Sequence, residues 1–187
     1  MKRVLVAAWA LVWMLGGGAT AMAEGFTSPY AGQEKRAIKS FYPKDIDDLS
    51  NGRGWGLAKP AELNGLPGPA HILPMANEIN LSADQRRRLE KLFAGMKAKA
   101  IPLGRRMIKL EGQLDQMFAA KTISREALDK HLRKIGEVWS ELRLVHLETH
   151  LLTPKILTPH QVARYNSLRG YSKGDAGGHG GGHGGHQ

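Results

Sequence analysis

The chain contains no cysteine among its 187 residues. Disulfides, thiolate metal ligands and thiol catalysis are therefore excluded, so a transition-metal site would need histidine, methionine or carboxylate ligands. The sequence also lacks a Gly-x-Ser-x-Gly nucleophile elbow, a phosphate-binding loop and any alternating apolar pattern typical of a β-strand. These absences favour an all-α protein that is not an enzyme.

Long apolar runs are also missing, apart from residues 4–15 near the N-terminus. This run is short for a membrane span, which needs about 20 residues. Lys2 and Arg3 precede it, and the small residues around Ala23 suit a cleavage site. Residues 1–23 therefore predict a signal peptide and a periplasmic location, with no stable membrane span after cleavage. The alternative is an uncleaved membrane anchor.

Positive charge exceeds negative charge, giving a formal net charge of +10, or about +8 without residues 1–23. Such a charge suits anionic surfaces or acidic protein partners, while an exported chain is not expected to bind nucleic acid. Residues 24–69 are rich in turn sequences, with a short helix expected around residues 34–40 and a helical turn at 58–63. We expect this loop-rich extension to cover another part of the protein.

Residues 70–171 form the predicted helical hairpin domain, starting with a short helix near residues 71–79. The apolar positions of residues 82–119 recur in heptads, the pattern of antiparallel hairpins. Pro102 should bend this helix. Residues 125–152 predict the returning helix, whose apolar seam is Leu128, Leu132, Ile135, Trp139, Leu142, Val145 and Leu152.

The same short signature, Leu-(Ser/Thr)-x-x-Gln, occurs at residues 81–85 and again at residues 157–161. It predicts a capping box. The hydroxyl of Ser82 or Thr158 accepts from the backbone N–H three residues on, and the glutamine side chain bonds back to the cap. Pro159 suits a first helical position, which needs no N–H donor. Helices are therefore expected to begin at both boxes.

His146 and His150 are the strongest candidate metal ligands of the helical region. Residues four apart share one face of a helix, so both imidazoles can reach one ion. Glu148 points away from them, which excludes the arrangement of a metalloprotease. Two interpretations stay open: two partly buried structural imidazoles, or a metal site completed by a third ligand. The candidates for that ligand are His71, Met75, Glu78 and the C-terminal tail.

That tail, residues 172–187, is composed mainly of glycine and histidine, so we expect it to be disordered. It carries His179, His183 and His186. Flexible histidine-rich tracts bind nickel, copper or zinc without a fold, which makes these residues further candidate ligands. A solvated linker is the alternative interpretation.

The two boxes, the signal peptide and the cysteine-free hairpin resemble the Spy/CpxP group of LTxxQ-motif periplasmic proteins, which includes the CnrX and ZraP types. Residues 30–34, 52–58, 61–65 and 162–171 carry further likeness. The resemblance implies a bent four-helix hairpin that forms a cradle-shaped homodimer. Members either shield unfolded proteins or bind metal and report to a membrane regulator. His146 with His150 is the counterpart of the His-x-x-x-Met pair of CnrX-type sensors.

We therefore predict a periplasmic stress-response protein that binds a divalent transition metal ion (zinc, nickel or copper). One alternative is an ATP-independent holdase chaperone that binds unfolded proteins on a concave surface. A second is an accessory regulator of a membrane sensor kinase, whose acidic ectodomain would meet the basic face of the hairpin.

Overall fold

A computed structural model describes residues 27–171. The predicted signal peptide and the predicted tail therefore lie outside the described residues. The chain divides into two compact units between Gly32 and Gln33. In the first, residues 27–32 contain a turn in which the backbone N–H of Ala31 donates to the carbonyl of Ser28. The second unit holds every helix of the described chain.

This second unit is built from helices, and no strand occurs within residues 27–171. The prediction of an all-α fold is confirmed. None of the described helices is both long enough and apolar enough to cross a membrane. The elements are η1 (Gln33–Lys35), α1 (Pro43–Ser50), α2 (Lys59–Leu63), α3 (Pro69–Ile72), η2 (Leu73–Met75), α4 (Ala83–Ala119), α5 (Arg125–Leu152), η3 (Thr153–Lys155) and α6 (Pro159–Leu168).

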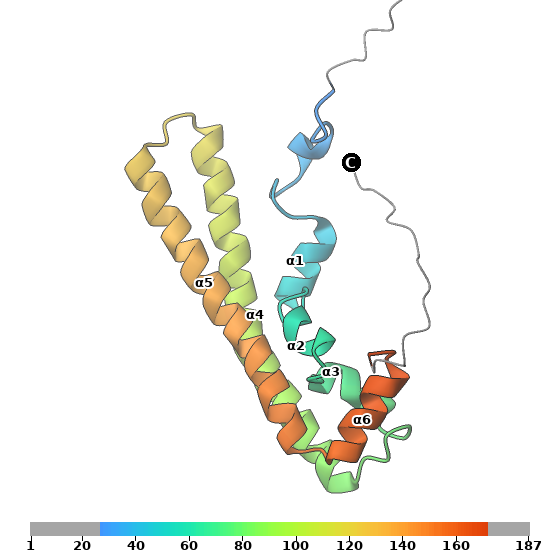
Figure 1. Ribbon diagram of the computed structural model, residues 1–187. Coiled ribbons are helices and arrows are strands. Elements are labelled where there is room, and N and C mark those ends of the chain that lie inside the picture. The colour runs from blue at the N-terminus through green and yellow to red at the C-terminus, as the bar shows by residue number, and fades with distance from the viewer. Residues whose placement is uncertain (1–26, 172–187) are drawn as a thin grey trace, which may run out of the picture. The chain divides into compact units, whose positions relative to one another are not determined.

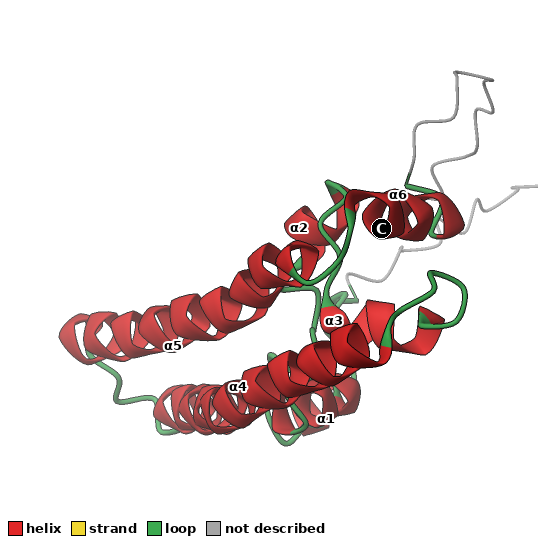
Figure 2. Ribbon diagram, turned by 90° about the horizontal axis from the view of Figure 1, so that it is seen from below, coloured by secondary structure: helices red, strands yellow, loops and turns green. Residues whose placement is uncertain are grey.

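The long helices α4 and α5 form an antiparallel hairpin, and the short N-terminal helices follow one side of it (Figure 1). Viewed from below, α1 lies against α4 (Figure 2). Helix α4 runs without interruption across Pro102. The Leu-(Ser/Thr)-x-x-Gln signatures are confirmed as capping boxes, at Ser82 for α4 and at Thr158 for α6.

The face of α5 that packs inward matches the predicted seam at Ile135, Leu142 and Val145 and differs from it at Leu132 and Trp139. Leu132 and Trp139 are 46 % and 38 % exposed, whereas His131 and Val138 are buried. The ring Nε2 of His131 hydrogen-bonds to the carbonyl of Leu110 at 2.8 Å, which compensates the burial of a polar side chain. At these two positions the buried residue thus lies one place earlier than the apolar pattern indicated, and the first of them is a histidine that can be buried because it is hydrogen-bonded.

Within the second unit, residues 33–69 of the loop-rich extension pack on the hairpin and contribute to its core. Its short helix is α1, later than predicted, because Asp45 accepts a 2.8 Å hydrogen bond from the backbone N–H of Tyr42 and starts the helix there. At the end of α1, the carbonyl of Leu49 touches Gly104 of α4 so closely that a Cβ there would lie 2.1 Å from it. The main apolar core contains Ile38, Phe41, Leu49, Leu57, Met96, Ala100, Met107, Leu110, Val138 and Leu142.

A second apolar cluster joins the start of α4 to α3 and α6. It contains Ile72, Ile79, Leu89, Leu157 and Tyr165. Tyr165 has no exposed surface, and its hydroxyl donates a hydrogen bond to the carboxylate of Glu62. This cluster therefore fixes α6 beside α2 and α3, where the candidate site lies.

Candidate functional site

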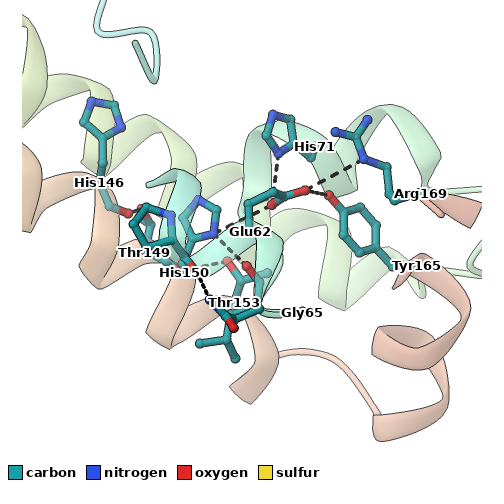
Figure 3. A network of polar contacts seen from close by, with 12 residues as sticks. Glu62, Gly65, His71, His146, Thr149, His150, Thr153, Tyr165 and Arg169 are labelled. Carbon is teal, nitrogen blue, oxygen red and sulfur yellow. Dashed lines mark hydrogen bonds and ion pairs between the residues drawn. The ribbon is translucent and has the colours of Figure 1, made fainter. Parts of the chain in front are cut away.

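The buried carboxylate of Glu62, on α2, is the centre of a polar cluster (Figure 3). Glu62 is 6 % exposed, and its Oε1 accepts a hydrogen bond from the hydroxyl of Tyr165 on α6. Its Oε2 lies 3.2 Å from Nδ1 of His71 on α3 and 3.8 Å from Nδ1 of His150 on α5. Nε of Arg169, just after α6, is 3.8 Å from Oε1. Groups from four parts of the chain thus meet at one carboxylate.

The turn after α2 supplies the backbone that holds His150. Gly65 adopts a φ of +81°, which reverses the chain direction at a conformation that favours glycine. The carbonyl of Leu66 then accepts a 2.7 Å hydrogen bond from Nδ1 of His150. A Cβ at Gly68 would lie 2.4 Å from Nε2 of the same ring, so the ring can pack here only against glycine. The loop sequence therefore fixes both edges of the imidazole.

The hydrogen bond to Leu66 determines the tautomer of His150. A carbonyl oxygen can only accept, so Nδ1 of His150 carries a proton. Metal-ligating histidines are oriented by this kind of bond. Here, however, Nε2 faces the backbone of Gly68 and is not directed at Glu62. His150 therefore supports the cluster from its buried side.

His146 lies one turn earlier on α5 and is 4 % exposed. Its Nε2 is buried without a hydrogen-bond partner. Burial, with a smaller contribution from the neighbouring charge of His150, lowers the pKa of His146 to about 4. The ring is therefore neutral at pH 7. Figure 3 shows it apart from the groups that surround Glu62.

The charge of Glu62 is held by its neighbours. Burial acts to raise the pKa of Glu62, but the close approach of His71, the hydrogen bond from Tyr165 and the attraction of both histidines outweigh it, and the pKa is lowered. Burial and the contact with Glu62 raise the pKa of Tyr165. Glu62 is therefore ionised at neutral pH, and the phenol of Tyr165 remains a donor.

One oxygen of this carboxylate lacks a proper partner. Oε2 of Glu62 has no neighbour with hydrogen-bond geometry, although Nδ1 of His71 is only 3.2 Å away. An unsatisfied buried carboxylate oxygen is costly. Ligand bonds of about 2.0–2.2 Å at angles of about 90–110° separate adjacent ligand atoms by about 2.8–3.6 Å. Glu62 and His71 therefore fit two adjacent positions around a transition-metal ion.

A pocket of about 560 Å³ opens beside this pair. The side chain of His71 is 45 % exposed, so its ring can be reached from the pocket. His146 and His150 also line it, as do Trp55 and Phe93. The site therefore combines a buried carboxylate, three imidazoles and aromatic surface.

Three of the predicted ligands, His71, His146 and His150, are thus gathered at one pocket, and two of them approach Glu62. Within residues 27–171 no group of three or more histidine, aspartate or glutamate side chains is placed to hold one metal ion. Met75 packs beside the second apolar cluster, and neither it nor Glu78 lines the pocket. The tail candidates, His179, His183 and His186, lie outside the described residues.

Sequence reasoning missed Glu62, Tyr165 and Arg169. Glu62 lies in the loop-rich extension, more than 80 residues before its partners of α5 and α6. No local spacing connects such distant positions. The only available signal was a single acidic residue between two turn sequences, which is also typical of an exposed loop.

Comparisons with protein-family models, with curated proteins and with solved structures gave no match to this chain. Its function is therefore argued from the site itself.

Proposed function

We propose that this protein acts in the periplasmic stress response by binding a divalent transition metal ion in the pocket beside Glu62. The observation that supports this is the 3.2 Å separation of Oε2 of Glu62 from Nδ1 of His71. The carboxylate is ionised and one of its oxygens lacks a hydrogen-bond partner, while the imidazole is accessible. Zinc, nickel and copper all accept a mixed nitrogen and oxygen ligand set.

Other members of the cluster would then orient the ligands. Tyr165 and Arg169 approach Oε1 of Glu62, which leaves Oε2 for the ion. His150 lies on the buried side of Oε2. Mutation of such neighbours commonly lowers metal affinity by about 10- to 100-fold. The positions that Glu62 and His71 do not fill remain open to non-protein ligands.

Calorimetric titration of the full chain with zinc, nickel and copper at pH 7 tests this function. The tail histidines are first replaced (H179A, H183A and H186A) so that they contribute no binding. We expect saturable binding of one ion per chain. E62Q and H71A should each weaken it at least tenfold, because each removes one ligand.

H160A is the matched control, since His160 is an exposed imidazole outside the pocket. Its affinity should equal that of the parent. Because E62Q alters a buried cluster, circular dichroism must show that it stays folded, while H71A changes a half-exposed ring and provides the safer comparison. Equal metal affinity in H71A and H160A would contradict the proposal.

A holdase chaperone is the second candidate. Helix α5 exposes several large apolar side chains, namely Leu132, Leu144 and Leu151, at 46–63 % exposure. Such a surface suits unfolded clients, and it also suits the predicted homodimer. Equimolar protein should slow aggregation of a chemically reduced client, and L144S with L151S should weaken the effect. Aggregation at an unchanged rate would exclude this activity.

A further inference from the structure

The pocket beside Glu62 is much larger than a metal ion needs. Its volume is about 560 Å³. One water molecule takes only about 30 Å³ of liquid, whereas sites for small organic ligands measure about 300–1,000 Å³. Only Glu62 and His71 lie at the separation of adjacent metal ligands, so the open coordination positions face this space. The space is therefore suited to a ligand that is larger than the ion.

The wall of the pocket carries uncompensated positive charge. Lys59 and Lys97 line it, and neither has a carboxylate within ion-pair distance among the described residues. Lys44 and Arg53 line it too, but both are paired with Asp48. Nζ of Lys97 lies 5.8 Å from the centre of the Phe93 ring, a contact that leaves its charge uncompensated by any carboxylate. A bare divalent cation would be repelled by these two lysines. An anion bound together with the cation would reverse that repulsion.

We infer that the pocket takes its metal ion as a complex with a small organic polycarboxylate. Glu62 and His71 bind the metal, and the ammonium groups of Lys59 and Lys97 pair with carboxylates of the chelate. Trp55 and Phe93 offer apolar surface to its carbon skeleton. This inference rests on the proposed metal-binding function and names the class of ligand that completes the site.

Equilibrium dialysis with radiolabelled citrate as the chelate tests the inference. It uses the full chain carrying H179A, H183A and H186A, with zinc, with citrate, or with both. We expect citrate to be retained only when zinc is present, at one citrate and one zinc per chain. The same experiment with zinc alone measures the proposed function separately.

Each other outcome is decisive. Zinc bound without citrate, with citrate acting only as a competitor, overturns this inference and leaves the metal function standing. Retention of neither overturns both proposals. Citrate retained without zinc overturns the inference in favour of a simple anion site.

Replacing both lysines should affect the retention of zinc–citrate and the binding of zinc alone differently. The double variant K59Q with K97Q should weaken retention of zinc–citrate at least tenfold, since it removes both ammonium groups that pair with the carboxylates of citrate. The same change should not weaken binding of zinc alone, because removing positive charge favours a bare cation. K130Q with K134Q is the matched control, since both lysines are exposed on α5 away from the pocket. Equal citrate retention in the two double variants would contradict the inference.

Discussion

The side-chain amides of Gln85 and Gln161 hydrogen-bond to each other in both directions, at 2.8 and 2.9 Å. Each glutamine also closes the capping box of its own helix, because its Oε1 accepts from the cap backbone N–H of Ser82 or Thr158. Each amide nitrogen donates further, Gln85 to the carbonyl of Ile156 and Gln161 to that of Asn80. The starts of α4 and α6 are thus joined through the residues that cap them.

Replacing both glutamines should reveal this connection. Q85A and Q161A should each lower the free energy of unfolding by about 1–3 kcal/mol, because each leaves partly buried amide and carbonyl groups unpaired. The double variant should lose less than the sum, since the bond between the amides can be lost only once. Urea unfolding of the four proteins measures the coupling. Effects that add within about 0.5 kcal/mol would show that the two caps are independent.

This pair separates what the sequence predicts from what it does not. Each capping box is local, so the spacing of Ser82 and Gln85 was sufficient to predict it. The pairing of the two boxes is a tertiary contact, and no period or motif links their positions. Likewise, the all-α fold follows from heptads, while the burial of His131 in place of Leu132 depends on the carbonyl of Leu110.

Two glycines of α4 should respond oppositely to alanine. A Cβ at Gly104 would lie 2.1 Å from the carbonyl oxygen of Leu49, so G104A must displace α1 and lower the unfolding free energy by about 1–3 kcal/mol. Gly95 has open space around its Cβ position, so G95A should raise stability by about 0.5–1 kcal/mol through helix propensity. Thermal unfolding measures both. A stabilised G104A would mean that α1 does not pack here.

Gly68 should control the position of His150. A Cβ there would lie 2.4 Å from Nε2 of the ring, so G68A must move the imidazole and break its 2.7 Å bond to Leu66. The Nδ1 proton of His150, held by that carbonyl, should give a slowly exchanging NMR signal that G68A abolishes. G54A is the control, because Gly54 lines the same pocket with nothing near its Cβ position. A signal that survives G68A would show that Gly68 does not control the position of the ring, and a parent protein without the signal would exclude a proton at Nδ1 of His150.

The candidate site could be predicted only in part from the sequence. As with the two capping boxes, local spacing can be recognised in a sequence, whereas contacts between distant residues cannot. His146 and His150 could be paired because a helix period connects them. Their neighbour Glu62 could not be found, since its place depends on the loop at Gly65 and on the packing of Tyr165. The structure also separates the predicted pair, with His150 bonded to Leu66 and His146 left without a partner at Nε2.

That unpartnered imidazole should make stability depend on pH. The pKa of His146 is about 4 in the folded protein, against an ordinary value of 6.5. Burial disfavours the charged ring most, and the neighbouring charge of His150 adds a smaller effect. Between these values the unfolded chain binds the extra proton, so the contribution of His146 is complete above pH 6.5 and is lost as pH falls toward 4. At about 1.4 kcal/mol per pH unit, the loss reaches roughly 3 kcal/mol.

Urea unfolding from pH 7.5 to pH 4 measures this loss, and H146Q removes the titrating group while keeping a polar side chain. The stability of H146Q should fall less steeply than that of the parent over this range, whereas H160Q, which alters an exposed ring, should keep the parental slope. Glu62 acts at lower pH, since its lowered pKa means that its contribution is lost only below about 4.5. If the free energy of unfolding depended on pH in the same way for H146Q and H160Q, burial would not hold His146 neutral. Nε2 of His146 would then have a hydrogen-bond partner in solution.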